Sequence, residues 1–412
     1  MENHYHLKDF FKGLYGSLDE FADRIYSLID YPITIEDANH RLLAYSAQTN
    51  ITDQARILTI MGRRVPEKVI NSLWKNGIIP YLLQNEKPII IDSIDEVGLG
   101  KRIAISIRKN DEVLGFIWAL ESDKAITDEK LSILAFAAKE AKNQLLLLQS
   151  RLKSQEDNYQ EFFWKLLTGH YTTETDIHTS AVKFPFTLSQ RYTVLVIEFE
   201  SSIDIELEKQ IIYLINTTQK VSIIFHTIDQ NKLILLIDAS REHQKEAISS
   251  FIKSFTADMK ERFNVTICSL GCGNVYTDYM DVDKSFSEAL EVISLKNRFK
   301  AELSSIYRYD ELGLYQYLQI INENRSNHGK QLPEGLRSIK QYDEEHQSQL
   351  YETLETYLTC NLNPAITATA LHIHPNTLTY RLKRISEISY YDLKNPKITS
   401  HLFIEIKLAN YF

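Results

Sequence analysis

The stretch that decides the fold of the C-terminal part reads NPAITATALHIHPNTLTYRLKRI, residues 363–385. It contains two start signals for helices, Asn363-Pro364 and then Pro375. An Asn side chain caps the free amide groups of a first turn, and Pro is tolerated at the first helical position because its missing N–H has no partner there. The sequence therefore predicts two short helices joined by a tight turn.

Apolar residues give each predicted helix one packed face. The expected packed face of the first helix consists of Pro364, Ala368 and Leu371. In the second helix, an apolar stripe at i, i+4 and i+7 is formed by Leu378, Leu382 and Ile385. Ile373, just before the second helix, is placed to pack on Leu378 as a hydrophobic staple.

The opposite surface of the second helix is polar and basic, although the whole chain has a formal net charge of -9. Its residues are Asn376, Thr377, Thr379, Tyr380, Arg381, Lys383 and Arg384. Arg and Asn can read base edges, while Thr, Tyr and Lys suit phosphates and the thymine methyl group. We therefore expect this helix to enter the major groove of double-stranded DNA as the second helix of a helix-turn-helix. The alternative is an amphipathic surface helix whose polar face meets only water.

Four separated motifs support the DNA-binding interpretation. They are SIKQYDEEH at 338–346, LETYL at 354–358, HPNTL at 374–378 and YRLKRI at 380–385. In this order they resemble the C-terminal domain of the PucR/CdaR family of bacterial transcriptional regulators. Family members often carry a basic residue where Pro375 stands and a polar one where Ile366 stands, so neither position is expected to contact DNA. The resemblance implies an effector-responsive activator of a catabolic operon, and the family's proline-responsive members suggest proline utilisation, with an amino acid such as proline as effector.

Length and composition predict a soluble protein of several domains. The chain has 412 residues, of which 44% are hydrophobic and 25% charged, as in ordinary globular proteins. No apolar run is long enough to span a membrane, and Met1–His6 lacks the pattern of a secretion signal. Three cysteines without a Cys-x-x-Cys pair favour a reducing cytoplasm. His372 and His374 have no carboxylate or cysteine cluster nearby, so we expect no metal site and no cofactor.

The sequence predicts an α+β multidomain protein whose residues 1–122 form a sensor domain. A helix over 17–30 precedes a hairpin over 31–45, a helical insert over 52–84, and strands over 88–92, 102–108 and 113–120. An antiparallel sheet with helices on one side is GAF/PAS-like, and such sheets hold small molecules between sheet and insert. The residues expected to grip an anionic or zwitterionic effector are Arg63, Arg64, Trp74, Tyr81, Arg102 and Trp118. Each of them, taken alone, favours a purely structural role.

Residues 123–168 are expected to form a long connecting helix, because 127–167 contain strong helix formers and neither Pro nor Gly. Apolar residues recur there at spacings of three and four: Leu131, Leu134, Ala138, Ala141, Leu145, Leu148 and Leu152. This seam suits a coiled coil or a parallel dimer contact. The alternative is a helix that caps its own sensor domain, with a break near 154–157. A homodimer or larger oligomer is expected in any case, because one helix-turn-helix buries too little surface to select a DNA site.

Residues 169–320 are expected to form a middle domain in which strands and helices alternate. The order is a strand at 192–199, a helix at 206–216, a hairpin at 221–237, a helix at 242–263, a strand at 265–271 and a helix at 284–295. This ferredoxin-like βαββαβ order resembles the degenerate GGDEF-like domain of the same family. The words SFSEA at 285–289 and YDELGLY at 309–315 also match it. An all-α helix-turn-helix domain is expected at 336–412.

The middle domain raises the alternative of a nucleotide-cyclase-like enzyme. Such an enzyme needs glycines and carboxylates at the central hairpin to hold a nucleoside triphosphate and its metal. The hairpin here reads IDQNK at 228–232, with no glycine and one acid. We therefore expect no catalytic residues. A protein that interacts with partners other than DNA remains the second alternative.

Overall fold

The computed structural model describes residues 17–46, 52–122, 124–182, 184, 188–240, 242–327 and 332–409. The segment Met1–His6 lies outside the described residues, as do the side chains of 149–158. The chain divides into two compact units, Met1–Leu290 and Glu291–Phe412, each with cores of its own. No helix among the described residues is long and apolar enough to cross a membrane.

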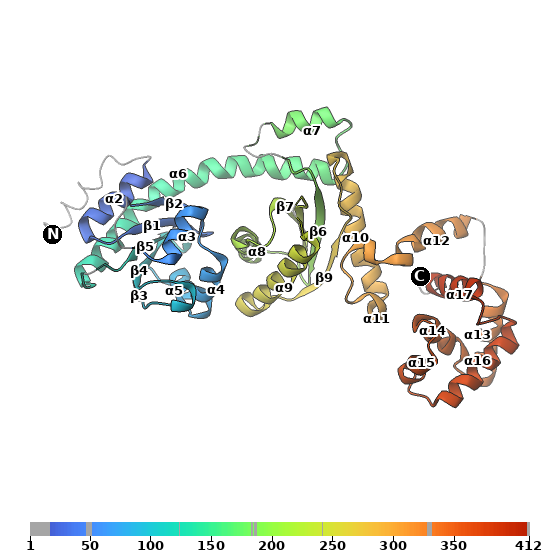
Figure 1. Cartoon of the computed structure of the whole chain (residues 1–412). Helices are drawn as coiled ribbons and strands as arrows, with labels where there is room; N and C mark the ends of the chain where they lie inside the picture. The colour runs from blue at the N-terminus through green and yellow to red at the C-terminus, as the bar shows by residue number, and fades with distance from the viewer. Residues whose placement is uncertain are drawn as a thin grey trace. The chain divides into compact units, whose positions relative to one another are not determined.

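The first sheet of the N-terminal unit has five antiparallel strands in the order β2-β1-β5-β4-β3 (Figure 1). The strands are β1 (Ile33–Asp37), β2 (Leu42–Tyr45), β3 (Ile89–Ile91), β4 (Arg102–Lys109) and β5 (Glu112–Leu120). The hairpin and the three later strands predicted from the sequence are confirmed.

Helices cover both faces of this sheet. On one face, α2 (Leu18–Ile29) and α6 (Asp128–Leu167) share a core with Ile103 and Ile117. On the other, α4 (Glu67–Lys75) and α5 (Ile78–Gln84) pack on Phe116 and Trp118, next to α3 (Gln54–Gly62). The expectation that helices cover only one side of the sheet was wrong. The central strands carry apolar side chains on both faces of the sheet, and the helical insert has an apolar face that packs on the second of them.

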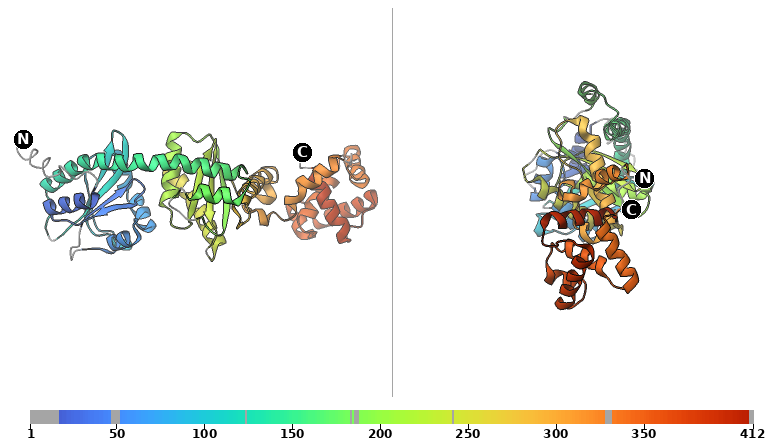
Figure 2. Two further views of the ribbon diagram at one scale, coloured as in Figure 1. Left: turned by 90° about the horizontal axis from the view of Figure 1, so that it is seen from above. Right: turned by 90° about the vertical axis from the view of Figure 1, so that its right-hand side faces the viewer.

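The connecting helix α6 is one uninterrupted helix of 40 residues, capped by the Thr127 hydroxyl (Figure 2). No break occurs near 154–157. Four residues of the predicted seam are buried in the sensor core: Leu134, Ala138, Ala141 and Leu145. The helix therefore caps its own sensor domain, and these four residues are not available to a second chain. Leu148 is half-buried, and the Leu152 side chain lies outside the described residues.

The second sheet of this unit follows the predicted βαββαβ order. Its strands are β6 (Tyr192–Phe199), β7 (Ile223–Asp229), β8 (Lys232–Asp238) and β9 (Ile267–Cys272), in the sheet order β7-β8-β6-β9 with every pair antiparallel. The helices are α7 (Glu174–Ala181), α8 (Ile205–Thr217), α9 (Gln244–Phe263) and α10 (Val282–Arg298). The predicted hairpin turns at Gln230, which takes a left-handed conformation with φ 54°.

The motif SFSEA at 285–289 has a packing role in the N-terminal unit. The Ser285 hydroxyl accepts the Val194 N–H at 3.0 Å. A Cβ on Gly273 would lie 2.1 Å from the Ser285 carbonyl oxygen, so only glycine allows this close approach of α10. Glu288 accepts hydrogen bonds from Asn274 and from the Tyr276 hydroxyl. The motif thus fixes α10 to the strand end at β9.

The C-terminal unit is entirely helical. It begins with the second half of α10 and continues through α11 (Lys300–Leu303), α12 (Leu318–Asn327), α13 (Glu334–His346), α14 (Leu350–Thr359), α15 (Pro364–Ala370), α16 (Pro375–Ser389) and α17 (Pro396–Ala409). The Lys407 ammonium is only 1% exposed and lies 2.5 Å from Glu302 and 3.4 Å from Glu355. This paired charge joins α17 to α11 and α14.

Candidate functional site

Two helices with independent caps form the predicted helix-turn-helix. The Asn363 side chain accepts the N–H groups of Ala365 and Ile366, at 3.0 and 3.2 Å, and so starts α15. His372 makes the turn with a left-handed φ of 54°. The His374 imidazole then accepts the Asn376 N–H at 3.2 Å and caps α16. His374 therefore has a capping role, and no metal-binding cluster occurs among the described residues.

The packed faces follow the prediction with one correction. In α16, Leu378 and Ile385 are fully buried and Leu382 is half-buried. In α15, Ala368 is buried but Pro364 is exposed, and Leu371, directly after the helix, is half-buried. Thr367, not Pro364, completes that face, and its hydroxyl donates to the Asn363 carbonyl at 2.7 Å. Pro364 lies on the same stripe as Thr367 and Ala368 but is exposed at the start of the helix.

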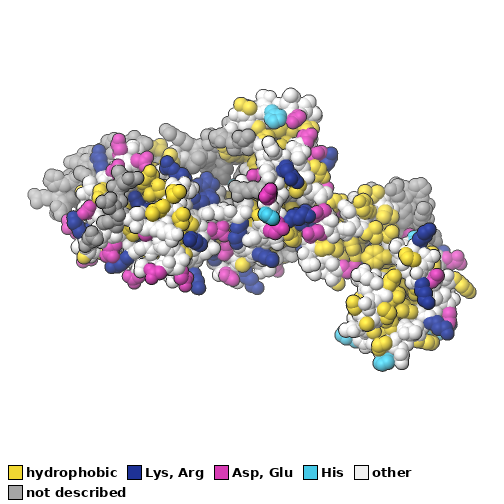
Figure 3. Space-filling model, in the orientation of Figure 1, with side chains coloured by type: hydrophobic (Ala, Val, Ile, Leu, Met, Phe, Trp, Pro, Cys, Tyr) yellow, Lys and Arg dark blue, Asp and Glu magenta, His cyan; other side chains and the backbone are white. Residues whose placement is uncertain are grey.

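The structure divides the seven polar residues of α16 into a front and one flank. Four of them recur at i, i+3, i+4 and i+7, opposite the buried stripe, and all four are exposed: Asn376, Thr379, Tyr380 and Lys383. Tyr380 is 67% exposed. We call these four residues the front face of α16. On the face of the C-terminal unit drawn in Figure 3, cationic side chains lie beside hydrophobic ones.

The two arginines of the predicted surface lie on one flank, between the front face and the buried stripe, and contact other helices. Arg381 donates to Thr353 Oγ1 at 3.1 Å and to Gln349 Oε1 at 3.2 Å, which links α16 to α14. Arg384 lies over the Tyr342 ring, 5.0 Å from its centroid, and pairs with Glu387 at 3.0 Å. Thr377 is exposed on the same side as Arg384.

The basic character of α16 is therefore weaker than the sequence suggested. The helix extends to Ser389 and includes Glu387, beyond the stretch in which no acidic residue was found. Lys383 is the cation of the front face. A surface with so few positive charges neutralises few phosphates, and each phosphate contact contributes to the salt dependence of DNA binding.

The six residues expected to hold an effector do not form one group. Arg102 is buried and pairs with Asp53, and Trp118 is buried in the core beneath α4 and α5. The indole N–H of Trp118 has no hydrogen-bond partner among the described residues. Trp74 donates to the Tyr213 hydroxyl of the middle domain at 2.7 Å. Tyr81 is half-buried on α5.

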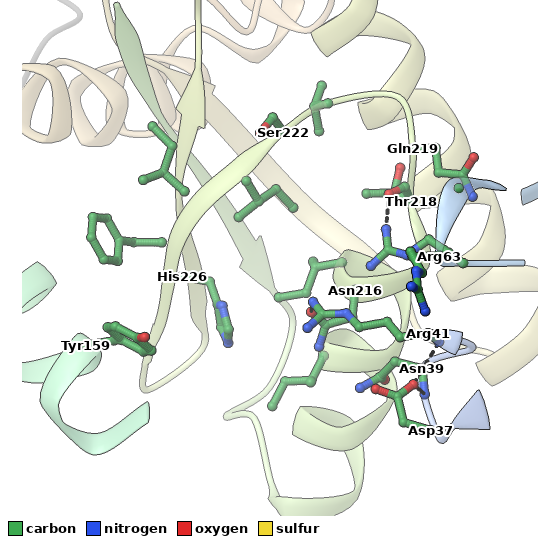
Figure 4. Close-up of a pocket in the computed structure, with 18 of the residues that line it drawn as sticks. Asp37, Asn39, Arg41, Arg63, Tyr159, Asn216, Thr218, Gln219, Ser222 and His226 are labelled. Atoms are coloured by element: carbon green, nitrogen blue, oxygen red, sulfur yellow. Dashed lines mark hydrogen bonds between the residues drawn. The ribbon is translucent and has the colours of Figure 1, made fainter. Parts of the chain in front are cut away.

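Arg63 and Arg64 line a cleft of about 1050 Å³ within the N-terminal unit (Figure 4). The cleft lies between the turn after β1 and the end of α3 on one side, and α8 and β7 on the other. Beside it, His40 is fully buried, stacks on Phe116 and shares hydrogen bonds of 3.1 Å with Glu36 and Tyr213.

These contacts between the sensor and middle domains were not predicted. Residues 40 and 213 are 173 positions apart, and neither belongs to a motif that signals an interaction. The hairpin over 31–45 was predicted, but Arg41 within it was given no role. Arg41 lines the cleft and donates to Asn216 at 3.1 Å.

The central hairpin of the middle domain, where a cyclase would carry glycines and carboxylates, has Gln230 and Asn231 at its turn. The Asn231 amide donates to the Phe199 carbonyl at 2.9 Å. Lys232 pairs with Glu198 at 3.2 Å. The side chains at this turn therefore contact their own sheet.

Comparison with known proteins defines the class. Residues 350–408 match the PucR C-terminal helix-turn-helix domain, and residues 168–295 match the GGDEF-like domain. The chain is 44% identical to the DNA-binding transcriptional activator AdeR of Bacillus subtilis (strain 168), over 98% of this chain and 95% of AdeR. It is 28% identical to the proline-responsive transcriptional activator PutR of the same organism, over 96% of this chain and 97% of PutR. The purine catabolism regulatory protein of that organism is 27% identical over 42% of this chain and 32% of its own length.

The helix-turn-helix and these relatives define a DNA-binding transcriptional regulator and not an enzyme. The chain belongs to the PucR/CdaR family of transcriptional regulators.

Proposed function

We propose that this protein is a cytoplasmic activator that binds operator DNA through α16 and responds to a small molecule sensed by its N-terminal domain. The observation that carries the DNA-binding step is the front face of α16, whose four exposed residues lie opposite the buried stripe. This is the geometry of a helix that places side chains on base edges while its other side holds the domain together.

Within this proposal the seven polar residues of α16 have different roles. Asn376 suits an adenine edge, Thr379 and Tyr380 suit bases or phosphates, and Lys383 suits a phosphate. Arg381 and Arg384 position the helix, because each is held by a neighbouring helix.

Assembly is the second part of the proposal. We place the sensor at 1–122, the connecting helix at 123–168, the GGDEF-like domain at 169–320 and the DNA-binding domain at 336–412. One copy of α16 offers few cations, so a homodimer gains affinity and reads two half-sites separated by about 34–36 Å or a multiple. The five-stranded antiparallel sheet of the sensor, with its helical insert, supports a GAF/PAS-like domain, although helices cover both of its faces.

The effector is the third part. Regulation of proline utilisation is supported by the 28% identity with PutR over nearly the full length. The 44% identity with AdeR is higher, so candidate effectors extend beyond proline.

DNA binding is tested by fluorescence anisotropy on the full-length chain. The labelled duplexes are one from the region upstream of its own gene and a scrambled one of equal length and composition. We expect the upstream duplex to bind at least about 1000-fold more tightly. Equal affinity for both duplexes would contradict the proposal. Sedimentation of the complex then tests the dimer, and a monomer on DNA would contradict that part alone.

The sensor role is tested by titrating the upstream duplex with and without proline, on the full chain and on a chain that begins after residue 122. We expect an effector to change the DNA affinity of the full chain only. The change cannot exceed the difference in the effector's affinity for the two conformations of the protein, one with higher and one with lower DNA affinity. A response that persists in the shortened chain would place the sensor elsewhere.

A further inference from the structure

The cleft between the sensor and middle domains combines a cluster of arginines with an apolar wall. Three arginines line it, Arg41, Arg63 and Arg64, whereas Asp37 is the one acidic side chain among the described lining residues. The Asp37 carboxylate already accepts the backbone N–H groups of Asn39 and Arg41, at 2.8 and 2.9 Å. No ion pair joins these arginines to a carboxylate in the described part of the chain.

The fold holds two of these cations directly opposite each other. Arg41 and Arg64 form an isolated antiparallel bridge, the arrangement in which like charges destabilise a pair of strands. Burial lowers the pKa of the Arg64 guanidinium and the charge of Arg41 lowers it further, while the Asp37 carboxylate opposes this shift without reversing it. A bound anion would remove this repulsion.

Arg41 and Arg64 make their side-chain hydrogen bonds with uncharged groups of the middle domain, whereas Arg63 lies 6.0 Å from the centroid of the Tyr45 ring in the sensor. Arg41 Nη2 donates to the Asn216 side chain at 3.1 Å, and Arg64 Nη1 donates to the Thr218 carbonyl at 3.3 Å. Each bond uses one nitrogen of a guanidinium that has five N–H donors. Figure 4 shows Arg41 and Arg63 gathered at the same end of the cleft as Asn216.

Arg63 occupies a backbone conformation that an arginine rarely adopts. It ends α3 in the left-handed region with φ 53°, directly after Gly62. Glycine is the usual residue at such a helix end, because a Cβ is unfavourable there. Placing arginine in that conformation directs a third guanidinium to this end of the cleft.

The other end of the cleft offers a different kind of contact. Figure 4 shows His226 and Tyr159 there, apart from the arginines. The Nε2 atom of His226 is buried without a hydrogen-bond partner among the described residues. Burial lowers the pKa of His226, so the imidazole is neutral near pH 7. Ile212, Ile215 and Ile223 contribute apolar surface to the lining.

We propose that this cleft binds a small organic carboxylate, whose anionic group contacts Arg41, Arg63 and Arg64 and whose carbon skeleton lies along the isoleucine wall toward His226. The inference rests on the proposed function as an effector-responsive regulator and moves the effector site from the interior of the sensor to this cleft. Bidentate donors in a fixed plane make arginine well suited to carboxylates.

A ligand in this position contacts both domains of the N-terminal unit. Its anionic group would meet arginines of the sensor, and its far end would meet β7 of the middle domain. Binding therefore favours the arrangement of these two domains in which both sets of contacts are made. This gives the ligand a direct way to change the protein beyond the sensor.

The test uses thermal unfolding and titration calorimetry of the full-length protein with three probes. Glutarate carries two carboxylates, glutaramide has the same skeleton without charge, and inorganic phosphate is an anion without a carbon skeleton. We expect glutarate to bind saturably and to raise the melting temperature. Glutaramide and phosphate are expected to bind at least about tenfold more weakly. Absence of saturable glutarate binding, or binding of glutaramide or phosphate as tight as that of glutarate, would overturn the proposal.

Variants then locate the site. Arg63→Gln leaves the bonds to Asn216 and Thr218 intact, and glutamine already adopts the left-handed conformation at Gln230 and Gln347. We expect it to weaken glutarate binding about tenfold, and Arg41→Gln with Arg64→Gln to abolish it. The matched control is Lys68→Gln with Lys75→Gln, which removes two exposed cations of α4 outside the cleft. Equal loss in the control would overturn the location.

Binding of the upstream duplex without any probe separates the two proposals. If the unmodified protein binds that duplex specifically and glutarate binding is absent or insensitive to Arg63→Gln, the cleft inference fails while the proposed function stands. If the protein binds no DNA specifically but binds glutarate through the arginines, the proposed function fails and the anion site stands.

Discussion

Arg381 Nη1 donates a hydrogen bond to the hydroxyl of Thr353 at 3.1 Å, and Thr353 is fully buried in α14. A residue that looks like a base-reading arginine in the sequence is therefore also the contact that holds α16 against α14. The same guanidinium reaches the Gln349 side chain at 3.2 Å. The orientation of the front face depends on this link between two helices.

Arg381→Ala is expected to lower both stability and DNA affinity. Loss of the two hydrogen bonds should reduce the free energy of unfolding by about 1 kcal/mol, measured by urea denaturation. Affinity should fall by a similar factor for the upstream and the scrambled duplex, because the whole helix is displaced. A loss confined to the upstream duplex, with unchanged stability, would show that Arg381 contacts a base instead.

Lys383→Ala is expected to weaken DNA binding without changing stability. Lys383 is exposed on the front face, so its loss removes a phosphate contact and little packing. The slope of log affinity against log salt concentration should become shallower by about 0.9 per half-site. Lys397→Ala, an exposed lysine on α17, is the control and should leave the slope unchanged.

Ile385→Asp is expected to unfold the DNA-binding domain. Ile385 is 0% exposed in the core shared with α13, α14 and α17, and a carboxylate there has no compensating partner. The cost should exceed about 3 kcal/mol in chemical denaturation. Lys383→Asp places the same residue two positions away on the surface and should fold normally. If Ile385→Asp folds as well, the assigned rotation of α16 is incorrect.

Tyr213→Phe is expected to loosen the sensor from the middle domain. The Tyr213 hydroxyl accepts the Trp74 N–H at 2.7 Å and shares a hydrogen bond with the buried His40. Phenylalanine leaves both nitrogens without that partner, at a cost of about 1–3 kcal/mol. Hydrogen exchange in β1 and β2 should accelerate accordingly. The control is Tyr390→Phe. Tyr390 is 91% exposed, so the loss of its hydroxyl should not change hydrogen exchange in β1 and β2.

His226 is expected to make the protein less stable at mildly acidic pH. Burial lowers the folded-state pKa of His226 below its unfolded value of about 6.5. Above that pH both states are neutral and the full stability is present. As the pH falls below about 6.5, the unfolded state binds the proton first, so stability is lost at up to about 1.4 kcal/mol per pH unit.

The His226→Gln variant should lose this part of the acid sensitivity between about pH 6.5 and pH 5. Melting temperature measured against pH checks it. His243→Gln, which removes an exposed histidine of the same domain, should keep the slope of the unmodified protein. An identical slope in all three proteins would show that His226 titrates alike in the folded and unfolded states.

Local patterns in the sequence determined the helix-turn-helix and both sheets. Asn363 and Pro375 start their helices because capping depends only on residues within one turn. The strands were found because side chains alternate between two faces along a strand. The hairpin at 228–232 could also be judged from the sequence alone, because the glycines and carboxylates that a cyclase needs would have to appear there.

Only the tertiary structure decided what each polar or apolar face contacts. The seam of α6 looked available to a second chain, but Leu134, Ala138, Ala141 and Leu145 are used in the sensor core. Arg381, which the sequence predicted to contact DNA, also links two helices. The arginine cleft joins residues far apart in the chain. Periodicity specifies that a face will be buried or exposed, whereas the partner of that face depends on packing between distant segments, which no local pattern encodes.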